Sequence, residues 1–237
     1  KIMIQKDKLY YLKNLELALL LSLKGMKTLI GFKMDCIERS ELAAVYRTLL
    51  DLEKKEFIEV GDKKQIRICP ELDMVLTDIK QADRMLLCIN REPEYPDRCI
   101  YLGNRAVFVS AYGAAGNMNR IESVPKNAVA EKVCENGFRL EEILSDESLY
   151  GKARIEKPEL EEKAGLLFGK DFTVLEEGKW GNITGCLKLV SLKNRQYKKQ
   201  YLLIRDGLDD YFAVTDEKTS IYPYSKRIIM EILNQDI

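Results

Sequence analysis

Residues 105–125, "RAVFVSAYGAAGNMNRIESVP", consist of two runs of strand-forming residues on either side of a glycine-rich segment. In the first run both faces are apolar or small, which is typical of an inner strand covered on two sides. A phosphate-binding loop would need a helix directly after the glycines, but a second extended run follows. We therefore predict that Gly113, Gly116 and Asn117 supply the positive-φ positions of a hairpin tip, and that this stretch is not a nucleotide site.

The pattern of strands, proline and helix that ends this stretch occurs again near the C-terminus. "RIESVPKNAVAEKV" (120–133) and "TSIYPYSKRIIMEI" (219–232) each pass from an extended segment through a proline into an amphipathic helix. The repetition predicts an α+β fold with a mixed or antiparallel sheet and two pseudo-symmetric halves, each a strand meander followed by a helix. The expected parts are 1–83, 84–140 and 141–237, together forming one compact unit.

The N-terminal part, 1–83, has a different pattern. After a short opening strand, "DKLYYLKNLELALLLSLKGM" (7–26) predicts a helix that Gly25 ends, and residues 38–56 predict an amphipathic helix against a core. An alternating hairpin (57–69) and a helix that begins at Pro70 follow. Helix, helix, hairpin, helix is the order of a winged-helix segment, whose usual role is DNA binding.

The charge of this segment does not favour DNA as the partner. The candidate recognition helix, 38–56, contains four basic and five acidic residues, so phosphate would be repelled rather than attracted. Only the hairpin is basic, with Lys63, Lys64 and Arg67. A DNA-binding regulator therefore remains the alternative interpretation, and a protein-binding scaffold is the leading one.

The composition excludes several kinds of site. The chain has no histidine, and its 38 basic and 38 acidic residues cancel; imidazole chemistry and a general field for nucleic acid are thus absent. No CxxC pair occurs, and no apolar run approaches the ~20 residues of a membrane span. We expect no catalytic residue, cofactor or metal, no membrane insertion, a cytoplasmic location, and reduced thiols at six positions: Cys36, Cys69, Cys88, Cys99, Cys134 and Cys186.

Three stretches together resemble the EspG-like proteins associated with type VII (ESX) secretion. These are "PELDMVLTDIKQADRMLLCINR" (70–91) after the winged-helix-like start, "ESVP" (122–125) at a helix entry, and "YPYSKRIIMEIL" (222–233) after the second meander. The resemblance implies a cytoplasmic α+β protein with two pseudo-symmetric halves. It also implies a chaperone that binds helical-hairpin secretion substrates.

The residues lead to a non-enzymatic module that binds another protein, and the resemblance implies that this partner is a small helical protein. Aromatic side chains dominate the energetics of protein interfaces, so exposed aromatics near the meander tips are the candidate contacts. Core burial is the competing interpretation, because alternating strands bury half of their apolar residues in any case. The candidate partner-binding residues are Tyr112, Met118, Trp180, Tyr211 and Phe212.

Overall fold

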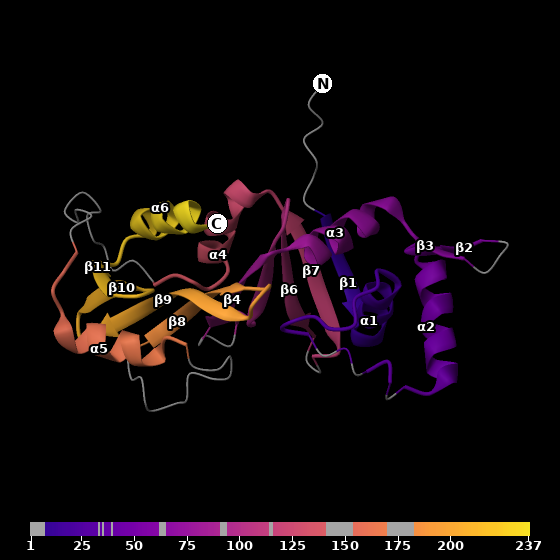
Figure 1. Cartoon of the computed structure of the whole chain (residues 1–237), viewed down its shortest axis with the longest axis horizontal. Coiled ribbons are helices and arrows are strands. Elements are labelled where there is room, and N and C mark those ends of the chain that lie inside the picture. The colour runs from indigo at the N-terminus through magenta and orange to yellow at the C-terminus, as the bar shows by residue number, and fades with distance from the viewer. Residues whose placement is uncertain are drawn as a thin grey trace, which may run out of the picture. The chain divides into compact units, whose positions relative to one another are not determined.

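The computed structural model describes residues 8–32, 34, 36–38, 40–61, 65–90, 94–113, 116–140, 154–169 and 183–237, which form an α+β fold (Figure 1). The chain divides into two compact units, each made of two segments. The first unit contains Lys1–Ala82 and Tyr101–Val124, and the second contains Asp83–Ile100 and Pro125–Ile237. This division differs from the expected consecutive parts because the β6–β7 hairpin belongs with the N-terminal segment.

Nine strands form an antiparallel sheet in the order β1-β7-β6-β5-β4-β8-β9-β10-β11. Two short strands, β2 and β3, form a separate hairpin. The strands are β1 (Lys8–Lys13), β2 (Ile58–Val60), β3 (Ile66–Ile68), β4 (Arg84–Asn90), β5 (Arg98–Leu102), β6 (Ala106–Tyr112), β7 (Met118–Val124), β8 (Ile183–Ser191), β9 (Gln196–Asp206), β10 (Asp209–Thr215) and β11 (Thr219–Pro223). The helices are α1 (Asn14–Leu23), α2 (Leu42–Lys54), α3 (Pro70–Gln81), η1 (Lys126–Ala128), α4 (Val129–Glu135), α5 (Pro158–Leu167) and α6 (Lys226–Asp236).

The start of the chain corrects the predicted helix over residues 7–26. Residues 8–13 form β1, which pairs antiparallel with β7, and the helix begins only at Asn14. The alternation of "KLYYLK" explains the strand: Leu12 is fully buried, whereas Leu9 and Tyr11 on the other face are exposed. Gly25, at φ 74°, follows the end of α1 as expected.

The hairpin predicted from residues 105–125 is confirmed. β6 and β7 pair from Ala106 opposite Val124 to Tyr112 opposite Met118, and both Gly113 and Gly116 have positive φ. Asn117 was expected to have positive φ and does not. Its carbonyl instead accepts the backbone N–H of Asn14, which fixes the hairpin tip to the start of α1.

In the second unit, helices cover both faces of the sheet formed by β8, β9, β10 and β11. Figure 1 shows α5 on one face and α6 on the other. The α5 face is a core to which Leu160, Ala164 and Leu167 of the helix contribute, together with Leu202 and Ile221 from the strands. Because both faces are covered, side chains of both parities along these strands are buried.

Both predicted passages from a strand through a proline into a helix are present. β7 leads through Pro125 into η1 and α4, and β11 ends at Pro223 just before α6. The helices α4 and α6 contact each other within the second unit, whereas β7 belongs to the first. The two repeats therefore do not correspond to the two compact units.

Candidate protein-docking surface

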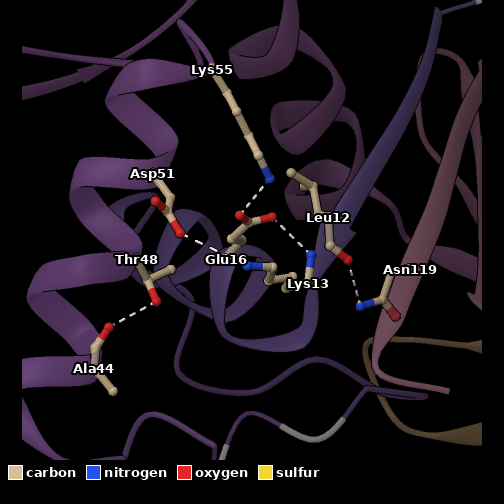
Figure 2. A network of polar contacts seen from close by, with 8 residues as sticks. All are labelled: Leu12, Lys13, Glu16, Ala44, Thr48, Asp51, Lys55 and Asn119. Atoms are coloured by element: carbon tan, nitrogen blue, oxygen red, sulfur yellow. Dashed lines mark hydrogen bonds and ion pairs between the residues drawn. The ribbon is translucent and has the colours of Figure 1, made fainter. Parts of the chain in front are cut away.

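The inner face of α2 is fixed to the junction of β1 and α1. Leu52 is fully buried, and α2 contacts α1. Two ion pairs connect the same elements: Lys55 Nζ lies 2.6 Å from Glu16 Oε1, and Lys13 Nζ lies 3.8 Å from Asp51 Oδ2 (Figure 2). Within the helix, the Thr48 hydroxyl donates to the carbonyl of residue 44 at 2.8 Å. These contacts define which side of α2 is available to a partner.

Glu16 contributes to this attachment with both of its carboxylate oxygens. Its side chain is fully buried, and its Oε2 accepts the backbone N–H of Lys13 at 2.8 Å while Oε1 accepts the Lys55 ammonium (Figure 2). A buried carboxylate is tolerated only when its oxygens are hydrogen bonded, and here both are. Glu16 therefore caps α1, covers the end of β1 and anchors α2 at the same time.

The outer face of α2 is apolar and exposed. Leu42, Tyr46 and Leu50 are 70%, 61% and 56% exposed, and their spacing of four residues aligns them along the helix. We call these three side chains the outer stripe of α2. It runs for about 12 Å at the rise of an α-helix. Large apolar side chains aligned on one helix face are the usual surface for packing a second helix.

Charged side chains border the outer stripe. Arg47 and Lys54, seven residues apart, lie along one side of it; both are exposed and neither makes an ion pair with the described residues. Glu53 is exposed at its C-terminal end. A helix that bound here would thus meet an apolar line with two cations on one flank, which favours carboxylates on the matching flank of the partner.

The sequence prediction that α2 packs its apolar residues against a core is only half right. Val45, Leu49 and Leu52 lie on the inner side, but the outer stripe does not. Together the six apolar residues cover an arc of about 160° of the helix, wider than the ~100° that one core contact requires. That width is the sequence signal that could have identified the outer stripe.

A depression of about 670 Å³ lies in the segment between α1 and α2. Its apolar lining comes from Met26, Leu29, Phe32, Met34 and Ile37. The methionines can adapt to differently shaped side chains. Because this segment leads into α2, the first unit presents a second apolar feature close in sequence to the outer stripe.

Two of the predicted contact residues lie together on an exposed face. Tyr112 is 49% exposed and sits opposite the half-buried Met118 in the hairpin. The Tyr112 ring packs on Tyr11 of β1, with ring centroids 4.8 Å apart. A third candidate, Trp180, lies outside the described residues. Tyr112 and Met118 are accordingly placed where a partner could reach them.

For the other two candidate contacts, Tyr211 and Phe212, the structure supports core burial, the competing interpretation, over exposure at an interface. Tyr211 is 5% exposed within the core under α5, and Phe212 is fully buried with its ring parallel to that of Tyr201. Phe138 also contacts Phe212, edge to face. The reason is that β10 is an inner strand between β9 and β11, with a helix on each side of the sheet.

A depression of about 820 Å³ in the second unit is lined by both signs of charge, including Arg84, Lys199, Asp216 and Asp236. Both carboxylate oxygens of Asp236 already have hydrogen-bond donors. Oδ1 accepts from the Lys199 ammonium at 2.6 Å, and Oδ2 accepts from the Tyr201 hydroxyl at 2.9 Å. Arg84 donates to the carbonyls of residues 236 and 237. Burial, and then the negative charge of Asp236, raise the pKa of Tyr201. This cluster holds the end of α6 in place.

The buried cysteines are not activated nucleophiles. Burial raises the pKa of Cys88 and of Cys186 to about 12, and that of Cys134 to about 11. A thiol with such a pKa stays protonated at neutral pH and behaves as a small apolar side chain. None of the six cysteines is in a disulfide, as predicted.

Comparison with known proteins assigns no family. No protein-family model matches the chain, and no curated protein matches it significantly. In the part of the chain that the structure describes, no cluster of three or more metal-binding side chains occurs. None of the helices in that part has the length and apolar character needed to cross a membrane.

Proposed function

We propose that this protein is a non-enzymatic binding module that takes an amphipathic helix of a partner protein on the outer stripe of α2. The exposure of Leu42, Tyr46 and Leu50 carries the proposal. Isolated exposed apolar residues are ordinary, but three aligned on one helix face cost solubility unless something covers them. The finer form of the proposal is a cytoplasmic chaperone for helical type VII secretion substrates, supported by the sequence resemblance described above.

DNA binding is the alternative. In its favour, α1, α2, the β2–β3 hairpin and α3 follow one another in the winged-helix order. Against it, the accessible face of α2 presents three large apolar side chains and Glu53. Phosphate contacts dominate affinity for DNA, and this face offers only Arg47 and Lys54 for them. A helical protein is therefore the better match to the surface.

Photocrosslinking from the outer stripe tests the proposal. A p-benzoylphenylalanine at position 46 replaces a side chain that is already exposed and aromatic, so the fold should be unaffected. We expect it to crosslink one small helical protein in the native cell extract after nuclease treatment. The matched control has the same residue at position 208, where the native leucine is 98% exposed in a turn of the second unit.

The identified partner is then purified and titrated calorimetrically against the variant with both Leu42→Asp and Leu50→Asp. Burial of each leucine is worth about 1.5–3 kcal/mol, so affinity should fall at least about 100-fold. Leu208→Asp should bind like the wild type. Equal binding by all three proteins would refute the α2 site. Recovery of discrete DNA fragments in a nuclease-free, low-salt repeat, with no protein crosslinked from position 46, would favour the alternative.

A further inference from the structure

The outer edge of β1 is an unpaired strand edge. β1 is the first strand of the sheet, and among the described residues its only strand partner is β7. The N–H of Asn14 points toward β7 and donates to Asn117, whereas the N–H of Lys13 points the opposite way and is accepted by Glu16. Because backbone groups alternate along a strand, Leu9 and Tyr11 must also direct their N–H and C=O groups outward.

These outward groups have no hydrogen-bond partner among the described residues. The carboxylate of Glu16 accepts the outward N–H of Lys13, so the unpaired edge ends before Lys13. Leu9 and Tyr11 are also the two β1 residues whose side chains are exposed, at 44% and 38%. The Tyr112 ring extends this face beyond Tyr11. We call Leu9, Tyr11 and their outward backbone groups the open edge of β1.

We propose that the open edge of β1 pairs antiparallel with the same edge of a second copy of this chain, around a two-fold axis at Tyr10. In this register Leu9 lies opposite Tyr11 of the second copy and Tyr11 lies opposite Leu9. Residues that both point outward then face each other, as a hydrogen-bonded antiparallel pair requires. Each such pair exchanges two bonds, so the two pairs together satisfy all the outward groups of both copies.

Charge and side-chain pattern fit this register. In this register no lysine position lies opposite another lysine position, which avoids like-charge repulsion across the strands. Leu9 and Tyr11 form aliphatic–aromatic cross-strand pairs on the exposed face, a favoured combination. Moving the register by two residues would place Leu9 opposite Lys13, whose N–H already belongs to Glu16. The self-complementary register is therefore the one that uses the whole open edge.

The interface is small, so we expect a reversible dimer that depends on concentration. Sedimentation equilibrium over a wide concentration range should show a rise from 27.3 kDa toward twice that mass. Leu9→Lys should weaken self-association at least about tenfold, because a charge on an edge opposes strand pairing. Leu208→Lys is the matched control: the same change at a 98% exposed leucine outside the edge should leave the dimer intact.

A crosslink provides the positive test. In this register Tyr10 lies opposite Tyr10 of the second copy as a non-hydrogen-bonded pair. The Cα atoms of such a pair are about 4.5 Å apart, a distance that a disulfide can span. Tyr10→Cys should form a disulfide-linked dimer under mild oxidation faster than the wild type or Leu208→Cys. A chain that is monomeric at every concentration, or a Leu9→Lys variant that dimerises like the wild type, would overturn the proposal. Variants of the outer stripe of α2 should not affect this assay.

Discussion

The two outermost strands of the sheet, β1 and β11, end it in different ways. At β11, the N–H of Ile155 donates to the Ile221 carbonyl at 2.8 Å, so an additional bridge covers the edge. The strand closes with Pro223, which has no N–H to offer. Within the described part of the chain, β1 has neither feature, and it exposes two apolar side chains, Leu9 and Tyr11, beside backbone groups that have no strand partner there.

The difference indicates which edge is available for interaction. Proteins usually protect edge strands with proline, charge or a covering segment, because an unpaired edge is a template for another chain. Such protection is present at β11. At β1, the one such contact among the described residues is at the last residue, where the N–H of Lys13 donates to the carboxylate of Glu16. We therefore expect β11 to serve stability and β1 to serve association.

The largest expected effect comes from removing a core side chain of the closed edge. Ile221 is fully buried against α5, so Ile221→Ala should cost about 4 kcal/mol of unfolding free energy. Leu9→Ala, at the open edge, should cost less than about 0.5 kcal/mol because that side chain is already half in water. Urea unfolding followed by circular dichroism measures both. Similar losses of unfolding free energy in Ile221→Ala and Leu9→Ala would show that the two edges contribute equally to stability.

Alkaline pH should destabilise the unit that contains β11. Burial raises the pKa of Cys88, Cys134 and Cys186 above the ordinary value of 9.0, and all three belong to the second unit. The folded state thus favours the protonated thiol. The contribution of each buried thiol to the free energy of unfolding is therefore complete below pH 9 and declines as pH rises toward 11 to 12. Between pH 9 and pH 10, the titration of each thiol should lower the free energy of unfolding by about 1 kcal/mol.

Together the three thiols should lower the free energy of unfolding by about 3 kcal/mol between pH 9 and pH 10. Guanidinium unfolding at pH 8, 9 and 10 measures this loss. Cys186→Ala serves as the control for titrating lysines and tyrosines, because it removes one thiol and leaves the rest. Its stability should fall about 1 kcal/mol less than that of the wild type. An identical pH dependence in both proteins would contradict the assignment.

A smaller effect should follow from changing the carboxylate that covers the end of β1. Glu16→Ala removes the cap of α1 and leaves the Lys13 N–H without its acceptor, which should cost about 2 kcal/mol. Glu16→Gln keeps one acceptor oxygen and should cost about 1 kcal/mol. Thermal unfolding at neutral pH separates the two. If Glu16→Gln were as unstable as Glu16→Ala, the ion pair with Lys55 would be the dominant contribution instead.

The sequence predicted best those features that depend on neighbouring residues. The β6–β7 hairpin follows from glycines between two extended runs, and the start of α3 at Pro70 follows from the fixed φ of proline. The helix predicted over residues 7–26 failed over residues 8–13, because "KLYYLK" fits either period over so short a length. Pairing with β7, more than 100 residues away in the chain, decides for the strand.

The burial of a side chain could be predicted only where a single packing contact, rather than helices on both faces of the sheet, determines it. Tyr211 and Phe212 follow a turn and carry aromatic rings, a pattern that fits a partner contact as well as core burial. Their burial depends on α5 and α6 covering opposite faces of the sheet, information that no local pattern contains. The outer stripe of α2 was missed for the converse reason: an apolar residue on an amphipathic helix was assumed to face a core.

The alternation of segments between the two units affects how the protein can be synthesised. The chain passes from one unit to the other after residues 82, 100 and 124. A ribosome releases residues in order, so the first unit lacks its β6–β7 hairpin until residue 124 has emerged, after part of the second unit. Neither unit can be obtained by cutting the gene once, and an incomplete nascent chain would hold β1 without β7, the strand that pairs with it.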